Sequence, residues 1–139
     1  MKKTFALIVF VLLFSVTVSS QKLTGTWNIT AYKTLKVNEP GYTLSDIGSF
    51  TFHKDTSGEL VVNYSILGID VNENSAYRWA ISQNMVALQG DVSDFIKTWI
   101  IVENKAKTQI WQSTDGKHTV YILELTKQAK NKSQTNSSK

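Results

Sequence analysis

The chain has 139 residues, 42% of them hydrophobic, and contains no cysteine, which excludes a disulfide scaffold, a thiol nucleophile and a thiolate metal site. Its formal net charge of +4 comes from lysines near the two termini, because residues 22–126 carry 9 basic and 11 acidic residues. A nucleic-acid-binding domain concentrates Lys and Arg on one face, so that class of protein is not expected.

Residues 1–20 have the layout of a secretory signal peptide. Two lysines precede an apolar run from Phe5 to Phe14, and Val18-Ser19-Ser20 offers small residues for cleavage before Gln21. An uncleaved membrane anchor is the alternative, but a spanning helix needs about 20 apolar residues and this run is shorter. We expect a protein exported to the periplasm, the cell surface or the medium, with no membrane span after cleavage. A lipid anchor is not expected, because no cysteine follows the cleavage site.

Eight runs of alternating apolar and polar residues follow, and such alternation is typical of half-buried β-strands. Trp27, Ile29 and Ala31 form the apolar face of the first run, with Tyr32 on its polar face. The runs cover residues 26–32, 50–53, 60–66, 76–81, 86–88, 95–102, 108–113 and 119–125.

Short turn signals separate most of the runs. Residues 54–58 and Asp115-Gly116 read as hairpin turns, and the polar residues 70–74 read as a break. Connections this short join antiparallel neighbours, since a parallel crossover needs about a dozen residues. An open series of eight antiparallel strands has two unpaired edge strands, and pairing the first strand with the eighth removes both edges. We therefore predict an all-β fold over residues 21–126, an eight-stranded antiparallel up-and-down barrel, with a β-sandwich as the alternative.

One connection is predicted to be long, from Thr34 to Gly48, with a turn signal at Glu39-Pro40-Gly41. It is either a lid over one mouth of the barrel or a plain surface loop. Residues 127–139 are almost entirely Lys, Gln, Asn, Ser and Thr, so they are predicted to form a disordered tail.

The opening Leu23-Thr24-Gly25-Thr26-Trp27-Asn28-Ile29 resembles the L-x-G-x-W-x-hydrophobic motif of lipocalins and their calycin relatives. The chain looks most like the short lipocalin-like domains that bacteria of the Bacteroidetes type export. Residues 49–58 are similar to the second and third strands of those domains, and residues 77–81 are similar to the fourth. The resemblance implies a lipocalin-like barrel whose interior holds a ligand, with Gly25 and Trp27 as its structural motif.

Two departures from the family limit this implication. Lipocalins usually stack an Arg near the last strand on the motif Trp, and residues 121–127 contain none. We therefore interpret Trp27 as a plug at the closed end of the barrel, packed among Ile29 and Leu125. Fatty-acid-binding relatives carry two helices after the first strand and a pair of interior arginines, and the 15 residues from Thr34 to Gly48 are too few for the helices.

No enzyme, cofactor or metal site is expected. His53 and His118 are isolated, whereas a metal site needs three or four converging ligands. No G-x-S-x-G nucleophile elbow or glycine-rich phosphate loop occurs. Asp91 and Asp94 flank a turn and are interpreted as part of a solvated loop.

The candidate ligand-binding residues are mostly aromatic. The alternation along their predicted strands directs four of these side chains inward: Phe50, Phe52, Tyr64 and Trp79. The predicted set also includes Arg78, Trp99 and Tyr121. In one interpretation the rings line a pocket for a small apolar molecule, with Tyr hydroxyls or Arg78 holding its polar end. In the other the rings fill the barrel.

The sixth run is apolar on both faces, with Trp99 and Ile101 opposite Ile96 and Ile100. This pattern predicts outward apolar surface, covered by the long connection or by a partner chain. Trp111 cannot be assigned to a face from its neighbours. We predict an exported, non-catalytic, lipocalin-like binder of a small hydrophobic or amphipathic ligand. The alternative is a ligand-free barrel that acts as a protein-interaction module in the cell envelope.

Overall fold

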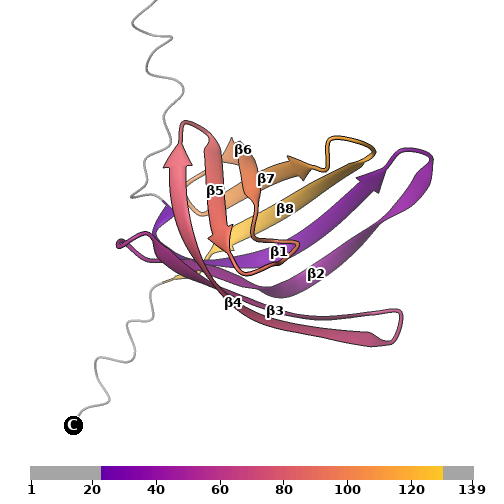
Figure 1. Cartoon of the computed structure of the whole chain (residues 1–139), viewed down its shortest axis with the longest axis horizontal. Helices are drawn as coiled ribbons and strands as arrows, with labels where there is room; N and C mark the ends of the chain where they lie inside the picture. The colour runs from indigo at the N-terminus through magenta and orange to yellow at the C-terminus, as the bar shows by residue number, and fades with distance from the viewer. Residues whose placement is uncertain (1–22, 130–139) are drawn as a thin grey trace, which may run out of the picture.

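The computed structural model describes residues 23–129, which fold into a closed antiparallel barrel (Figure 1). Each strand pairs with the next along the chain, and β1 pairs with β8 to close the barrel. The predicted all-β barrel is therefore confirmed, whereas the predicted signal peptide and most of the predicted tail lie outside the described residues. The strands are β1 (Gly25–Lys36), β2 (Glu39–Phe52), β3 (Ser57–Ile66), β4 (Ile69–Ser82), β5 (Met85–Gly90), β6 (Thr98–Asn104), β7 (Thr108–Thr114) and β8 (Thr119–Lys127).

The predicted long connection from Thr34 to Gly48 is wrong. β1 and β2 continue through it as a paired hairpin, from Gly25↔Phe52 to Lys36↔Glu39, and only Val37-Asn38 lie between the strands. Both strands are largely polar and exposed there, so no alternation marked them in the sequence. The segment is neither a lid nor a plain loop.

The predicted break at residues 70–74 is also wrong, because these residues lie within β4. The turn falls earlier, at Leu67-Gly68, where both residues have positive φ (51° and 76°). β2 pairs with β3 only between Gly48↔Val62 and Phe52↔Gly58. Beyond Gly48 the β1–β2 and β3–β4 hairpins diverge as two arms (Figure 1).

A β-bulge at Thr30 changes which face of β1 points inward. Ile29 pairs with Leu125 and Ala31 with Glu124, so Thr30 is an extra residue opposite β8. Its hydroxyl donates a hydrogen bond to the Glu124 carbonyl at 3.0 Å. Tyr32, predicted to lie on the polar face, is consequently buried with 3% of its surface exposed.

The G-x-W motif closes one end of the barrel. Trp27 is fully buried, and its Nε1–H donates to the Leu23 carbonyl at 2.9 Å. The Lys127 ammonium lies 5.5 Å from the centroid of the Trp27 ring. A lysine of the last strand therefore makes the cation–π contact with the motif Trp.

Candidate functional site

The half of the interior next to Trp27 is filled by interlocked aromatic side chains. Four of the predicted ligand residues, Phe50, Phe52, Trp79 and Trp99, are buried there. Their ring centroids lie 5.4 Å (Phe52–Trp79) to 6.5 Å (Trp99–Trp111) from those of their neighbours. Trp111, which the sequence could not assign, is fully buried among them. Because these rings pack on one another, they form the floor of the barrel.

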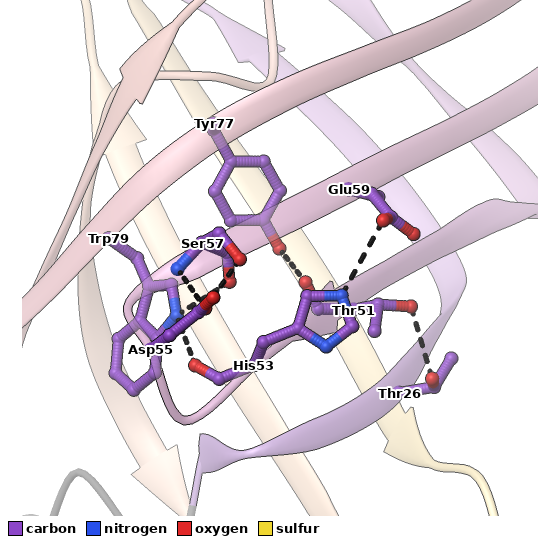
Figure 2. A network of polar contacts seen from close by, with 8 residues as sticks. All are labelled: Thr26, Thr51, His53, Asp55, Ser57, Glu59, Tyr77 and Trp79. Atoms are coloured by element: carbon purple, nitrogen blue, oxygen red, sulfur yellow. Dashed lines mark hydrogen bonds and ion pairs between the residues drawn. The ribbon is translucent and has the colours of Figure 1, made fainter.

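Polar contacts tie this floor to the β2–β3 turn (Figure 2). The Trp79 Nε1–H lies 3.1 Å from the carbonyl oxygens of His53 and Ser57. The Tyr77 hydroxyl donates to the Thr51 carbonyl at 2.6 Å, and burial raises the pKa of that hydroxyl. The polar atoms of Trp79 and Tyr77 are thus engaged by backbone, as expected for buried groups that hold a turn in place.

The charged residues of the same turn are also engaged with one another (Figure 2). The Asp55 carboxylate accepts hydrogen bonds from the hydroxyl and backbone N–H of Ser57, and these bonds lower its pKa. His53 Nε2 lies 3.5 Å from a Glu59 carboxylate oxygen on the exposed surface. These contacts join residues of the β2–β3 turn to one another and to β3, so they stabilise the hairpin.

The expectation that Arg78 holds a ligand inside the barrel is corrected by its position. Tyr77 and Trp79 on either side point inward, so Arg78 lies on the exposed outer face. Its guanidinium lies 3.4 Å from the Asp55 carbonyl and 3.3 Å from the Thr56 hydroxyl, both in the β2–β3 turn.

The other half of the interior is lined by tyrosines, and we call it the open half because Tyr42, Tyr64 and Tyr121 remain at least partly exposed. Tyr32 lies 6.3 Å from Tyr42 and 6.4 Å from Tyr121 between ring centroids, and the Tyr32 and Tyr121 rings are nearly parallel. Tyr64 packs against the same core from β3 and stays partly exposed. The sequence predicted Tyr64 and Tyr121; it missed Tyr32 because of the bulge and Tyr42 because no apolar alternation marks its part of β2.

The hydroxyls of Tyr32, Tyr42, Tyr64 and Tyr121 have no hydrogen-bond partner within the part of the chain that the structure describes, unlike the Tyr77 hydroxyl. Burial raises the pKa of Tyr32 and Tyr64, and Tyr42 and Asp94 add to both shifts. The hydroxyls of Tyr32 and Tyr64 therefore remain protonated at neutral pH and are available as hydrogen-bond donors.

The segment between β5 and β6, residues 91–97, folds against this tyrosine cluster. Phe95 is 3% exposed, its ring lies 4.9 Å from that of Tyr32, and its carbonyl accepts a hydrogen bond from Trp99 Nε1–H at 2.9 Å. The Ser93 hydroxyl donates to the Glu73 carboxylate at 2.6 Å, which ties the segment to β4. The sequence predicted a strand from Phe95, but β6 begins only at Thr98.

Lys97 brings a cation into the same half of the barrel. Its ammonium lies 3.6 Å from the centroid of the Tyr121 ring and 4.9 Å from that of Trp99. Burial lowers the pKa of this ammonium, and the carboxylates of Asp94 and Asp115 oppose the shift more weakly. No sequence signal marked Lys97, because its position depends on the fold of residues 91–97.

Other parts of the described chain offer weaker candidates. A pocket of about 240 Å³ lies at the closed end, lined by Asn104, Lys105, Ala106, Gln109 and Lys127, and it is below the roughly 300 Å³ at which small-molecule sites begin. Within residues 23–129, no group of three metal-ligating side chains converges. In the same range no helix is long and apolar enough to span a bilayer.

The predicted apolar surface on the outside of the sixth strand is present in part. Ile100 is 44% exposed and Val102 is 55% exposed, and Met85 of β5 pairs with Ile100 and is 46% exposed. Ile96 instead packs against the core. The segment from Thr34 to Gly48 does not cover this patch, because it lies in the β1–β2 hairpin.

Comparison with known proteins identifies the architecture. No protein-family model and no curated protein matches the chain. A crystal structure of a lipocalin-like protein from Bacteroides uniformis ATCC 8492 superimposes with a TM-score of 0.53 over 77% of this chain and 99% of that chain, at 10% sequence identity. The barrel is lipocalin-like. An uncharacterized protein from Bacteroides eggerthii DSM 20697 matches with a TM-score of 0.49 over 73% of this chain and 98% of that chain, at 13% identity. At such identities, the first likeness confirms the lipocalin-like fold that the motif Gly25-Thr26-Trp27 indicated.

Proposed function

We propose that this lipocalin-like chain is an exported, non-catalytic protein that binds one small amphipathic molecule in the open half of its barrel. The observation that carries the proposal is the cluster of Tyr32, Tyr42, Tyr64 and Tyr121, whose hydroxyls have no hydrogen-bond partner within residues 23–129. Aromatic faces bind the apolar part of a ligand, and hydroxyls bind its polar part.

The packed floor supports this assignment because its rings mark where the candidate site ends inside the barrel. Phe52 and Trp111 of this floor are buried, and their ring centroids lie 5.9 Å apart. A ligand therefore lies against Phe95 and the tyrosine rings. The raised pKa of Tyr32 and Tyr64 favours binding over catalysis, because a hydroxyl that stays protonated is a poor base and a poor nucleophile. Export rests on the signal-peptide pattern of residues 1–20.

Titration with N-phenyl-1-naphthylamine, a neutral amphipathic fluorophore, tests the proposal. We expect saturable binding of one molecule per chain, and Tyr64→Ala should weaken it about twofold to tenfold, since one ring contact contributes about 0.5–1.5 kcal/mol beyond its area. Asn63→Ala is the matched control, because Asn63 precedes Tyr64 on β3 and lies exposed on the opposite face. Native mass spectrometry of freshly purified protein should show a bound small molecule. Absence of saturable binding, or equal weakening by both variants, would overturn the assignment.

The exposed patch of Met85, Ile100 and Val102 favours a second candidate, a protein-interaction module in the cell envelope. Three large apolar side chains side by side on the outside of a barrel are typical of a contact surface. Cross-linking in envelope extracts should then yield a discrete adduct that Ile100→Lys abolishes. An adduct that persists with Ile100→Lys would argue against the patch.

A further inference from the structure

The position of Lys97 indicates which kind of ligand the open half accepts. Its ammonium is half-buried between the rings of Tyr121 and Trp99 and forms no ion pair with any described residue. A half-buried cation that forms no direct ion pair carries a desolvation cost, and ring faces offset it only in part. A ligand that brings an anionic group would complete this site.

A second, independent feature lies beside the same ring. Thr34 is 2% exposed, and its Oγ1 is the buried side-chain polar atom without a hydrogen-bond partner within residues 23–129. Thr34 pairs directly with Tyr121 on β8 and with Tyr42 on β2, so the three side chains share the inner face. An unsatisfied hydroxyl and an unpaired ammonium therefore flank one tyrosine.

The neighbouring carboxylates are engaged elsewhere or lie at the rim. Glu73 accepts the hydrogen bond from Ser93, and Asp115 accepts from three backbone N–H groups of the β7–β8 turn. Asp94 is exposed, and it acts on Lys97 and on the tyrosines only through space. Among the described carboxylates that act on Lys97, Asp94 is thus the one that no hydrogen bond engages, and it competes with an incoming anion for Lys97.

We propose, on the basis of the ligand-binding function above, that the ligand is an amphipathic acid. Its anionic group pairs with the Lys97 ammonium and accepts a hydrogen bond from Thr34 Oγ1. Its apolar body lies against Tyr32, Tyr64 and Phe95. The Lys97 charge makes the site selective for acids over alcohols of the same shape.

Three ligands with one naphthyl body and different head groups test this selectivity. Competition against N-phenyl-1-naphthylamine compares 1-naphthoate, 1-naphthalenemethanol and (1-naphthylmethyl)trimethylammonium. We expect the acid to bind about tenfold or more tightly than the alcohol, since an ion pair in a partly buried site is a strong discriminator. Tighter binding of the cation than of the acid would overturn the proposal and would assign the tyrosines and Asp94 to an organic cation.

Variants separate the role of the charge from that of the fold. Lys97→Met should remove the preference for the acid over the alcohol, whereas Lys97→Arg should retain that preference. Asp94→Asn should tighten binding of the acid alone, and Thr34→Val should weaken binding of the acid about tenfold or more, since a hydrogen bond to a charged group contributes about 1.5–3 kcal/mol. An acid preference that survives Lys97→Met refutes this inference even though the neutral probe still binds. Failure of the neutral probe to bind refutes the function itself.

Discussion

Replacing Phe52 with Leu tests whether the aromatic floor is the structural half of the barrel. Phe52 is 1% exposed, and its ring meets four others, at 5.9 Å (Phe50), 5.5 Å (Tyr77), 5.4 Å (Trp79) and 5.9 Å (Trp111). Each aromatic pair contributes about 0.5–1.5 kcal/mol beyond its area, but four pairs that share one ring do not add independently. Leu keeps most of the apolar volume, so we expect a loss of about 2–3 kcal/mol in the free energy of unfolding.

Urea denaturation followed by far-UV circular dichroism measures this loss, because fluorescence would also report the altered surroundings of the tryptophans. With a slope of roughly 1–3 kcal/mol/M, the midpoint should fall by about 0.7–3 M. Tyr64→Leu is the comparison in the open half: Tyr64 is partly exposed and makes no ring contact within residues 23–129, so its loss should stay below about 1 kcal/mol. The division into floor and open half is refuted if the two variants lose equal stability, or if Phe52→Leu costs less than about 1 kcal/mol.

Three further changes probe other parts of the barrel. Lys127→Met should lower the free energy of unfolding by about 0.5–1 kcal/mol through loss of the cation–π contact with Trp27, whereas Lys127→Arg should not, as urea midpoints would show. Gly48→Ala should prevent folding or destabilise it severely, because a Cβ there would lie 1.9 Å from the Val61 carbonyl oxygen; a cooperative, near-native melt would contradict this close approach. The Asp115 carboxyl has its pKa lowered from 3.8 to about 2 by backbone hydrogen bonds, so its stabilising effect is present above pH 3.8 and is lost as the pH falls toward 2. Asp115→Asn should flatten that part of the acid-unfolding curve, and an unchanged curve would show that the turn does not depend on the charge.

Much of the barrel could be predicted because its signals are local. Residues such as Leu60, Val62, Tyr77 and Trp79 alternate strictly, and strands that bury one face require such alternation. The sequence did not predict the outer parts of the β1–β2 and β3–β4 hairpins, because exposed strands need no apolar face. Residues 39–47 and 70–74 are held by pairing with β1 and β3, and a proline at position 40 is tolerated near the start of an exposed strand.

The candidate site was harder to predict than the fold because it depends on register and on one irregular segment. A single extra residue at Thr30 turns Tyr32 inward, and nothing in the local sequence distinguishes a bulge from continuous alternation. Arg78, the sequence's only arginine, was the obvious cation, yet strict alternation with Tyr77 and Trp79 places it outside.

The sequence by itself determined the number of strands, their order and the closed end at Trp27, since alternation, short turns and the G-x-W motif act within a few residues. The tertiary structure alone decided that the Lys97 ammonium lies over the inward-pointing rings of Tyr121 and Trp99. The fold of residues 91–97 buries Phe95 against Tyr32, a residue far away in the chain, and that contact carries the Lys97 ammonium onto Tyr121. Contacts between distant residues depend on how the strands are staggered around the barrel, and local sequence patterns carry no record of that stagger.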